Sequence, residues 1–298
     1  MTGVLDDLES RPGSTTALLR TVIGSTMRDH GGRLSTAALV ALMEAVGVPP
    51  GRTRTALTRL KAKGLIASTN GTGPAGYALT PAAATMLDEG DLRIYEPRAM
   101  ADGDPWCLIS FSVPEQHRAV RHQLRRRIGE IGCGTVASGL WIGPEYLTEE
   151  VEGIVAELGL ADHVTVFVTD QIREPDLPAA AARWWDLTAL RARHEDFLAA
   201  HDAELAAYRA DEGPRAAFRA WIRVLDAWRP IPYLDPGLPT TLLPASWPGL
   251  RSIQLFRESR DSLAATAAGY ARGVTGLGGG NGASPVQPQT AAGKGKTA

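Results

Sequence analysis

The stretch between Pro50 and Gly64 carries the side chains of this sequence that are best suited to binding a charged ligand. Its basic residues are Arg52, Arg54, Arg59, Lys61 and Lys63, and no carboxylate interrupts them. Arginine and lysine pair with phosphates, and arginine and threonine also reach base edges in the major groove of DNA. A solvated face is the commoner role of an isolated charged helix, so the flanking elements must decide between the two.

Helical spacing divides this stretch into two faces. At about 100° per residue, one side of the helix contains Thr53, Ala56, Leu57 and Leu60. Thr55 and Thr58 point the opposite way, among the basic side chains. Pro50 suits a first helical turn and Gly64 suits the position after a helix end, so we expect one short helix between them. Its first face is predicted to be buried and its second to be cationic.

The elements predicted around the basic helix match a DNA-binding arrangement. They are, in order, helices over 15–28 and 35–47, a link over 47–51, the basic helix, and strands over 65–69 and 77–80. Three helices followed by a β-hairpin predict a winged helix-turn-helix over residues 15–90. The candidate DNA contacts are the basic side chains of the basic helix with Thr55 and Thr58. The glycine-rich wing tip adds Asn70, Gly71 and Thr72 to them.

Length and composition are those of a soluble globular protein with more than one domain. The chain has 298 residues, 44% of them hydrophobic and 21% charged, and a formal net charge of −2. Affinity for nucleic acid must then come from local charge rather than from overall attraction. We expect Cys107 and Cys133 to be reduced, buried thiols. Residues 1–14, which we expect to be disordered, contain no signal segment, and no run is long enough to span a membrane, so a cytoplasmic location is predicted.

The middle of the chain predicts an α+β unit over 105–175, after a linker over 91–104. The order is a strand over 106–113, a helix from residue 114, a strand region over 135–142, a helix over 145–158 and a strand over 164–168. This order fits a ferredoxin-like fold if a hairpin lies within the second strand region. The arginine cluster over 118–127 is flanked by Glu115 and Glu130, so a solvated face is favoured there over a nucleic-acid site.

The C-terminal part, over 176–272, predicts a mostly helical domain. Helical patterns cover 178–209, 215–228 and 249–272, and a proline-rich segment over 229–239 separates the last two. We expect this segment to be extended, because its prolines oppose a helix. The tryptophans around it suit either a site for a flat, partly apolar ligand or an ordinary core. Glycine, alanine and polar residues over 273–298 predict a disordered tail.

No set of residues forms a recognisable catalytic pattern. His194 and His201 lie seven residues apart, not at the four-residue spacing of two zinc ligands on one helical face. Ferredoxin-like nucleases of the CRISPR-associated type hold a metal with an aspartate near the end of the first strand, where this chain has Phe111-Ser112-Val113-Pro114. We therefore predict a non-enzyme with no catalytic residues, no metal site and no cofactor. The alternatives are a metal-dependent nuclease and a non-catalytic protein-interaction module.

A series of short motifs, in order along the chain, carries a family resemblance. They are Arg54-Thr55-Ala56-Leu57 with Arg59-Leu60 and Gly64, Arg93-Ile94-Tyr95, Arg118 with Arg121, Gly132-x-Gly134, Trp141-Ile142-x-Pro144, Asp235-Pro236-x-Leu238-Pro239, Leu242-Leu243-Pro244 and Trp247-Pro248-Gly249. Together they resemble the PaaX-type transcriptional repressors over nearly the whole chain, to about Arg272. The resemblance implies an α+β multidomain fold with an N-terminal winged helix, a central domain related to the CRISPR-associated nuclease fold but used for association, and a helical C-terminal domain.

The resemblance also implies a function. It suggests a homodimer that binds double-stranded operator DNA, represses aromatic-acid catabolic genes such as those for phenylacetate, and leaves DNA when an aryl-CoA such as phenylacetyl-CoA binds. Family members usually carry a further Trp ahead of Trp106, an aromatic residue in place of Cys133, and His-x-Tyr-Arg where this chain has Asp226-Ala227-Trp228-Arg229. Because of these departures, the effector could instead be a different acyl-CoA or an aromatic acid. The candidate ligand-binding residues are Trp228, Arg229, Asp235 and Trp247.

Overall fold

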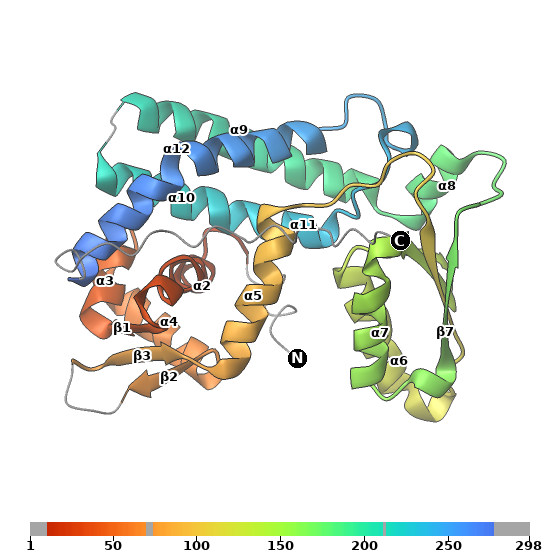
Figure 1. Ribbon diagram of the computed structural model, residues 1–298, viewed down its shortest axis with the longest axis horizontal. Helices are drawn as coiled ribbons and strands as arrows, with labels where there is room; N and C mark the ends of the chain where they lie inside the picture. Colours follow the sequence, from red (N-terminus) through yellow and green to blue (C-terminus); the bar gives the residue numbers. More distant parts are fainter. Residues whose placement is uncertain (1–10, 70–73, 211–212, 277–298) are drawn as a thin grey trace, which may run out of the picture.

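The chain forms three connected units in the computed structural model (Figure 1). The structure describes residues 11–69, 74–210 and 213–276. An N-terminal unit of helices and a small sheet lies below a layer of long C-terminal helices, and an α+β unit lies beside them (Figure 1). Helix α5 runs from the N-terminal unit toward the place where the three units meet.

In its described residues, the N-terminal unit contains three α-helices and a three-stranded antiparallel sheet. The helices are α2 (Thr15–Thr26), α3 (Thr36–Ala45) and α4 (Pro50–Ala62), and the strands are β1 (Arg33–Ser35), β2 (Ile66–Thr69) and β3 (Gly76–Leu79). Strand β3 is central, with β1 and β2 on its two sides. Ser14 and Ser35 accept hydrogen bonds from backbone N–H groups in the first turns of α2 and α3, as N-cap residues do. The predicted helices and hairpin are present, and β1 is an edge strand that the sequence did not predict.

Helix α5 (Pro81–Tyr95) follows the hairpin. Thr80 caps it, because its Oγ1 accepts from Ala83 N at 3.2 Å. We expected a linker from residue 91, but the helix continues to Tyr95. The reason is that this last turn is packed: Ile94 is buried, and Arg93 donates to backbone carbonyls of the other two units.

The central unit is a four-stranded antiparallel sheet with two helices packed on it. Its elements are β4 (Trp106–Phe111), α6 (Arg118–Glu130), β5 (Gly134–Ala137), β6 (Leu140–Pro144), α7 (Thr148–Glu157) and β7 (Val164–Thr169). The strand order β5-β6-β4-β7 gives the β-α-β-β-α-β arrangement that the sequence predicted, with β5 and β6 as the hairpin. Cys107 and Cys133 are free and buried, as expected.

The C-terminal part is helical. Its helices are α8 (Leu177–Trp184), α9 (Leu187–Ala210), α10 (Pro214–Trp228), α11 (Ile231–Leu234) and α12 (Gly249–Thr275). In the described residues, short 3₁₀ turns lie at Arg28–His30, Glu115–His117, Glu145–Leu147, Ala161–His163 and Thr240–Leu242. Helices α9, α10 and α12 form the layer above the N-terminal unit (Figure 1).

Three details differ from the sequence-based expectations for this part. The helix expected over 178–209 is interrupted between α8 and α9. The segment expected to be extended over 229–239 begins with the short helix α11, because Pro232 falls in its first turn, where no intrahelical N–H bond is lost. Helix α12 continues to Thr275, past the start of the expected tail at 273.

One hydrophobic core joins the N-terminal unit to the C-terminal helices. It includes Leu19 and Leu57 from the N-terminal helices together with Trp221 and Phe256 from α10 and α12. Smaller cores lie between the central sheet and α6 and α7, and around α8. Because the first core is shared, the N-terminal unit is packed against the helical layer and is not attached to it through a linker alone. Among the described helices, none combines the length and the apolar run of a membrane span.

Candidate nucleic-acid interface

Helix α4 has one buried and one exposed face, divided as the sequence predicted. Its buried side chains are Thr53, Ala56, Leu57 and Leu60, which are 0–2% exposed. They pack against α2 and α3. Pro50 lies in the first turn, and Gly64, just past the end, adopts φ = +73°. That left-handed conformation costs a residue with a side chain about 1–2 kcal/mol, so glycine suits the position.

The exposed face of α4 holds the basic and threonine side chains predicted to contact DNA. Arg52, Arg54, Thr55, Thr58, Arg59, Lys61 and Lys63 are all exposed. The hydroxyls of Thr55 and Thr58 donate to the carbonyls of Gly51, at 3.1 Å, and Arg54, at 3.2 Å, one turn earlier. Each hydroxyl oxygen therefore keeps its lone pairs for an outside donor such as an amino group on a base edge.

The cations of α4 differ from those of α6 in their partners. Within the described part of the chain, no carboxylate lies within ion-pair distance of Arg52, Arg54 or Arg59. In α6, by contrast, Arg118 and Arg121 pair with Glu115, Arg126 with Glu130, and Arg127 with Glu157. In the described residues, these three arginines of α4 are thus not compensated by a carboxylate, whereas most of the arginines of α6 are paired within the central unit.

The hairpin of β2 and β3 lies beside the C-terminal end of α4. Thr80 Oγ1 donates to Gly64 O at 2.7 Å, which fixes the end of β3 to the end of α4. In β3, Gly76 passes β1 so closely that a Cβ would collide with the carbonyl of Leu34. The predicted contacts Asn70, Gly71 and Thr72 lie outside the described residues.

Two arginines of α10 fix the turn that precedes α4. Arg219 Nε donates to Ala45 O at 3.1 Å, and Arg223 Nη2 donates to Val46 O at 3.4 Å. The last carbonyls of a helix have no partner within it and carry the negative end of its dipole, so cations there are favourable. The C-terminal helices therefore hold the connection between α3 and α4.

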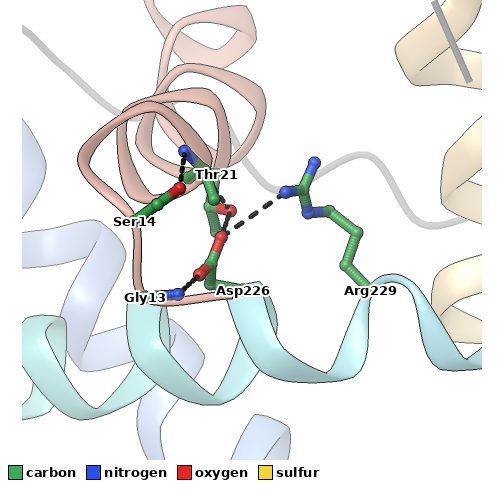
Figure 2. Close-up of polar contacts among 6 residues, drawn as sticks. Gly13, Ser14, Thr21, Asp226 and Arg229 are labelled. Atoms are coloured by element: carbon green, nitrogen blue, oxygen red, sulfur yellow. Dashed lines mark hydrogen bonds and ion pairs between the residues drawn. The ribbon is translucent and has the colours of Figure 1, made fainter. Parts of the chain in front are cut away.

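A buried carboxylate ties the start of α2 to α10 (Figure 2). Asp226 is 1% exposed and accepts from Gly13 N at 2.7 Å and from Thr21 Oγ1 at 2.8 Å. It also pairs with Arg229 Nη2 at 3.4 Å. Gly13 belongs to the segment that we expected to be disordered, and this hydrogen bond is one reason that its last residues are ordered. Helix α2 is therefore fixed by polar contacts as well as by packing.

A cavity of about 820 Å³ lies where the three units meet. Arg93 of α5 spans this junction: it donates to Pro232 O at 3.0 Å and to Ile131 O at 2.5 Å. Its guanidinium also pairs with Glu150 at 2.6 Å and lies 4.9 Å from the ring centre of Tyr233. One side chain thus connects the N-terminal unit to the central and C-terminal units.

Aromatic side chains with arginines over their rings border the same cavity. The Arg98 guanidinium lies 5.6 Å from the ring centre of Tyr146, and that of Arg191 lies 5.4 Å from the ring of Trp247. Burial raises the pKa of Tyr146 above its usual value, so its hydroxyl stays protonated and donates to Pro236 O at 2.5 Å. The cavity wall is therefore partly aromatic, with Tyr146 uncharged at neutral pH.

Family models match three successive parts of the chain. The model described as PaaX-like protein matches residues 14–83, the PaaX protein central Cas2-like domain matches 99–181, and the PaaX-like protein C-terminal domain matches 185–273. The chain belongs to the PaaX family. These matches cover the described units in the order that the sequence motifs predicted.

One curated protein and one solved structure are similar to this chain over most of its length. The transcriptional repressor PaaX of Escherichia coli (strain K12) is 26% identical over 250 residues, which covers 82% of this chain and 78% of that protein. Among solved structures, the uncharacterized protein Rv0674 from Mycobacterium tuberculosis matches with a TM-score of 0.52 and 20% identity, over 85% of this chain and 96% of that one. At this identity the structural likeness shows the fold alone.

Three of the four residues predicted to bind a ligand line the cavity of this PaaX-family protein. They are Trp228, Asp235 and Trp247. Trp228 is 1% exposed, and its ring stacks on Phe256 with centres 4.8 Å apart, so most of it serves the core. Asp235 accepts from His194 Nε2 at 2.9 Å if that nitrogen carries the proton. Arg229 lies away from this cavity, in the network of Asp226.

Sequence reasoning missed the roles of Arg93, Arg219 and Arg223. Arg93 was visible as part of a PaaX-family motif, but its partners are 38 to 139 residues away in the chain. Arg219 and Arg223 have the pattern of ordinary charged helix residues, and nothing local indicates that they bind the end of α3. Among the described residues, no group of three or more His, Cys, Asp or Glu side chains is placed to hold a metal ion.

Proposed function

We propose that this protein is a transcriptional repressor that binds double-stranded operator DNA through α4, as the recognition helix of a winged helix-turn-helix. The observation that carries the proposal is the exposed face of α4, with arginines that no carboxylate compensates in the described residues. The arginines, Thr55 and Thr58 contact base edges and nearby phosphates, and Lys61 and Lys63 contact phosphates alone. The hairpin of β2 and β3 is the wing. The family and the name of the Escherichia coli relative support a regulator over an enzyme.

The repressor acts as a homodimer and responds to a small effector. One recognition helix contacts few base pairs, so two copies on two half-sites supply the affinity that an operator requires. The controlled genes are those of aromatic-acid catabolism of the phenylacetate type, and an aryl-CoA or a related effector releases the DNA. Release requires that the effector favour a DNA-incompetent arrangement by a few kcal/mol. The core shared by the N-terminal unit and the C-terminal helices supports release of DNA by an effector, because a shift of those helices moves α4 as well.

Selection of bound duplexes from a random pool, followed by affinity measurements at fixed salt, tests the DNA-binding proposal. Arg54→Ala is expected to weaken operator binding about 5- to 150-fold and to relax specificity at one position. Lys61→Ala is expected to weaken all duplexes alike, because it removes a phosphate contact. Arg125→Ala, on the exposed side of α6, is the matched control and leaves affinity unchanged. Unchanged affinity in Arg54→Ala with a loss in Arg125→Ala would assign DNA binding to the central unit and refute the proposal.

A further inference from the structure

The exposed face of α4 has short side chains along its centre. At 100° per residue, Gly51 and Ala62 lie within about 10° of the line opposite the middle of the buried face. Thr55 and Thr58 lie within about 30° of that line. All four residues are exposed, and a Cβ on Gly51 would meet no atom within 4 Å. No long side chain on this central line therefore keeps the helix backbone away from the floor of a groove.

Long cationic side chains flank this central line on both sides. Arg54 and Lys61 lie on one side, and Arg52 and Arg59 lie on the other. Arg54 and Arg59 are about 70° from the central line, whereas Arg52 and Lys61 are about 90° from it. In a helix that lies in the major groove, the first pair points toward the base edges and the second pair toward the phosphates at the rim.

The exposed side chains of α4 restrict which bases this helix can hold. They are arginine, lysine, threonine and alanine, and residues 50–62 contain no Asn, Gln, Asp or Glu. Asn and Gln are the side chains that pair bidentately with adenine, and Asp and Glu accept from the amino group of cytosine. Arginine pairs bidentately with O6 and N7 of guanine. Guanine is therefore the one base for which this face carries a two-bond partner.

The threonines add contacts without choosing between base pairs. The hydroxyl hydrogens of Thr55 and Thr58 are used in bonds to Gly51 O, at 3.1 Å, and Arg54 O, at 3.2 Å, so both hydroxyls can only accept from DNA. Both kinds of base pair offer one amino donor in the major groove, on adenine or on cytosine. The specificity of α4 must then come from its arginines.

Arg54 and Arg59 are able to bind two separate guanines. Neither has an ion-pair partner in the described part of the chain, so neither must break one before it binds DNA. They are five residues apart, which is about 7.5 Å along the helix axis at 1.5 Å per residue. Base pairs are about 3.4 Å apart, so two arginines at this separation address different base pairs.

We propose that α4 reads each operator half-site at two guanines, one bound by Arg54 and the other by Arg59. Arg52 and Lys61 bind phosphates on the two sides of the groove. The proposal rests on the proposed operator binding through α4 and adds the bases that this helix selects. The short side chains on the central line allow the approach to the bases that both arginines need.

7-Deazaguanine tests this reading directly, because it lacks the N7 acceptor in the major groove and keeps its Watson–Crick pairing. A half-site is selected from random duplexes with the full chain, and each conserved guanine is then replaced in turn at fixed salt. At the two guanines bound by arginine, the replacement is expected to weaken wild-type binding at least about threefold. 7-Deazaadenine at conserved adenines is the matched control and is expected to leave the affinity within about twofold.

Three alanine variants assign each guanine to its arginine. In Arg54→Ala, one of the two 7-deazaguanine effects is expected to vanish while the other stays, and Arg59→Ala is expected to give the reverse. Arg52→Ala is the contrast, since it is expected to weaken all duplexes alike and to keep both effects. All three positions are exposed and alanine is the best helix former, so the variants are expected to fold.

The outcomes separate this proposal from the repressor proposal. A selected half-site in which no guanine is conserved, or in which 7-deazaguanine is tolerated everywhere, would overturn the reading of guanine and leave the repressor proposal standing. Both effects persisting in Arg54→Ala and in Arg59→Ala, or one vanishing in Arg52→Ala, would refute the assignment to these two arginines. Selection that returned no preferred duplex would refute the proposed function itself, and this reading with it.

Discussion

Replacing Asp226 tests how α2 is fixed to the C-terminal helices. Asp226→Ala removes the acceptor of the Gly13 N–H and of the Thr21 hydroxyl (Figure 2). It also takes away the carboxylate beside Arg229, whose side chain is 8% exposed. Removing one partner of a buried ion pair costs about 3–5 kcal/mol, because the other charge stays buried.

The magnitude converts to a measurable shift in thermal unfolding. A chain of this size loses about 2–4 °C of Tm per kcal/mol, so Asp226→Ala is expected to unfold about 6–20 °C below the wild type. Asp261→Ala, at an aspartate whose side chain is 70% exposed, is the control and is expected to stay within about 0.5 kcal/mol. Circular dichroism on both variants supplies the comparison. Equal Tm values for the two variants would refute the reasoning, since they would show that the buried network contributes no net stability.

Three further predictions test individual parts of the structure. Leu57→Ala, in the buried face of α4, is expected to lower the free energy of unfolding in urea by about 2–5 kcal/mol. Thr58→Ala, on the opposite face, is expected to change it by less than about 0.5 kcal/mol. Similar losses in the two variants would contradict the division into faces. Gly64→Ala is expected to cost about 1–2 kcal/mol because of its positive φ, and a stabilised variant would contradict that conformation. Burial raises the pKa of Cys133 and of Cys107, so both thiols stay protonated near pH 8 and are expected to resist iodoacetamide until guanidinium unfolds the chain. Mass spectrometry follows the labelling, and rapid native alkylation would refute the burial.

Local patterns were enough to predict α4. Leu57 and Leu60 recur at helical spacing, and Pro50 and Gly64 mark the ends, so both the helix and its buried face follow from a short stretch of sequence. The strand and helix order of the central unit was predictable for the same reason. What these patterns could not provide is the partner of a side chain that lies far away in the chain.

The residues that connect the units show this limit. Asp226 contacts Gly13 and Thr21 across more than 200 positions, and Arg219 contacts Ala45 across 174. No periodicity encodes such pairs, because they depend on how the units pack. The same limit applies to Arg93, which was noticed as a motif while its position at the junction was not foreseen. The candidate DNA contacts were therefore predictable from the sequence, and the residues that position them were not.

The most direct measurement of the central claim is a cross-link from α4 to DNA. Thr55→Cys places a thiol on the exposed face of α4, and Gln123→Cys places one on the exposed side of α6, while Cys107 and Cys133 stay buried. Each variant is labelled with a short photo-cross-linker and irradiated with a selected operator duplex. The label on α4 is expected to cross-link to bases within the half-site, and the label on α6 is not. Cross-links from α6 alone would contradict DNA binding through α4.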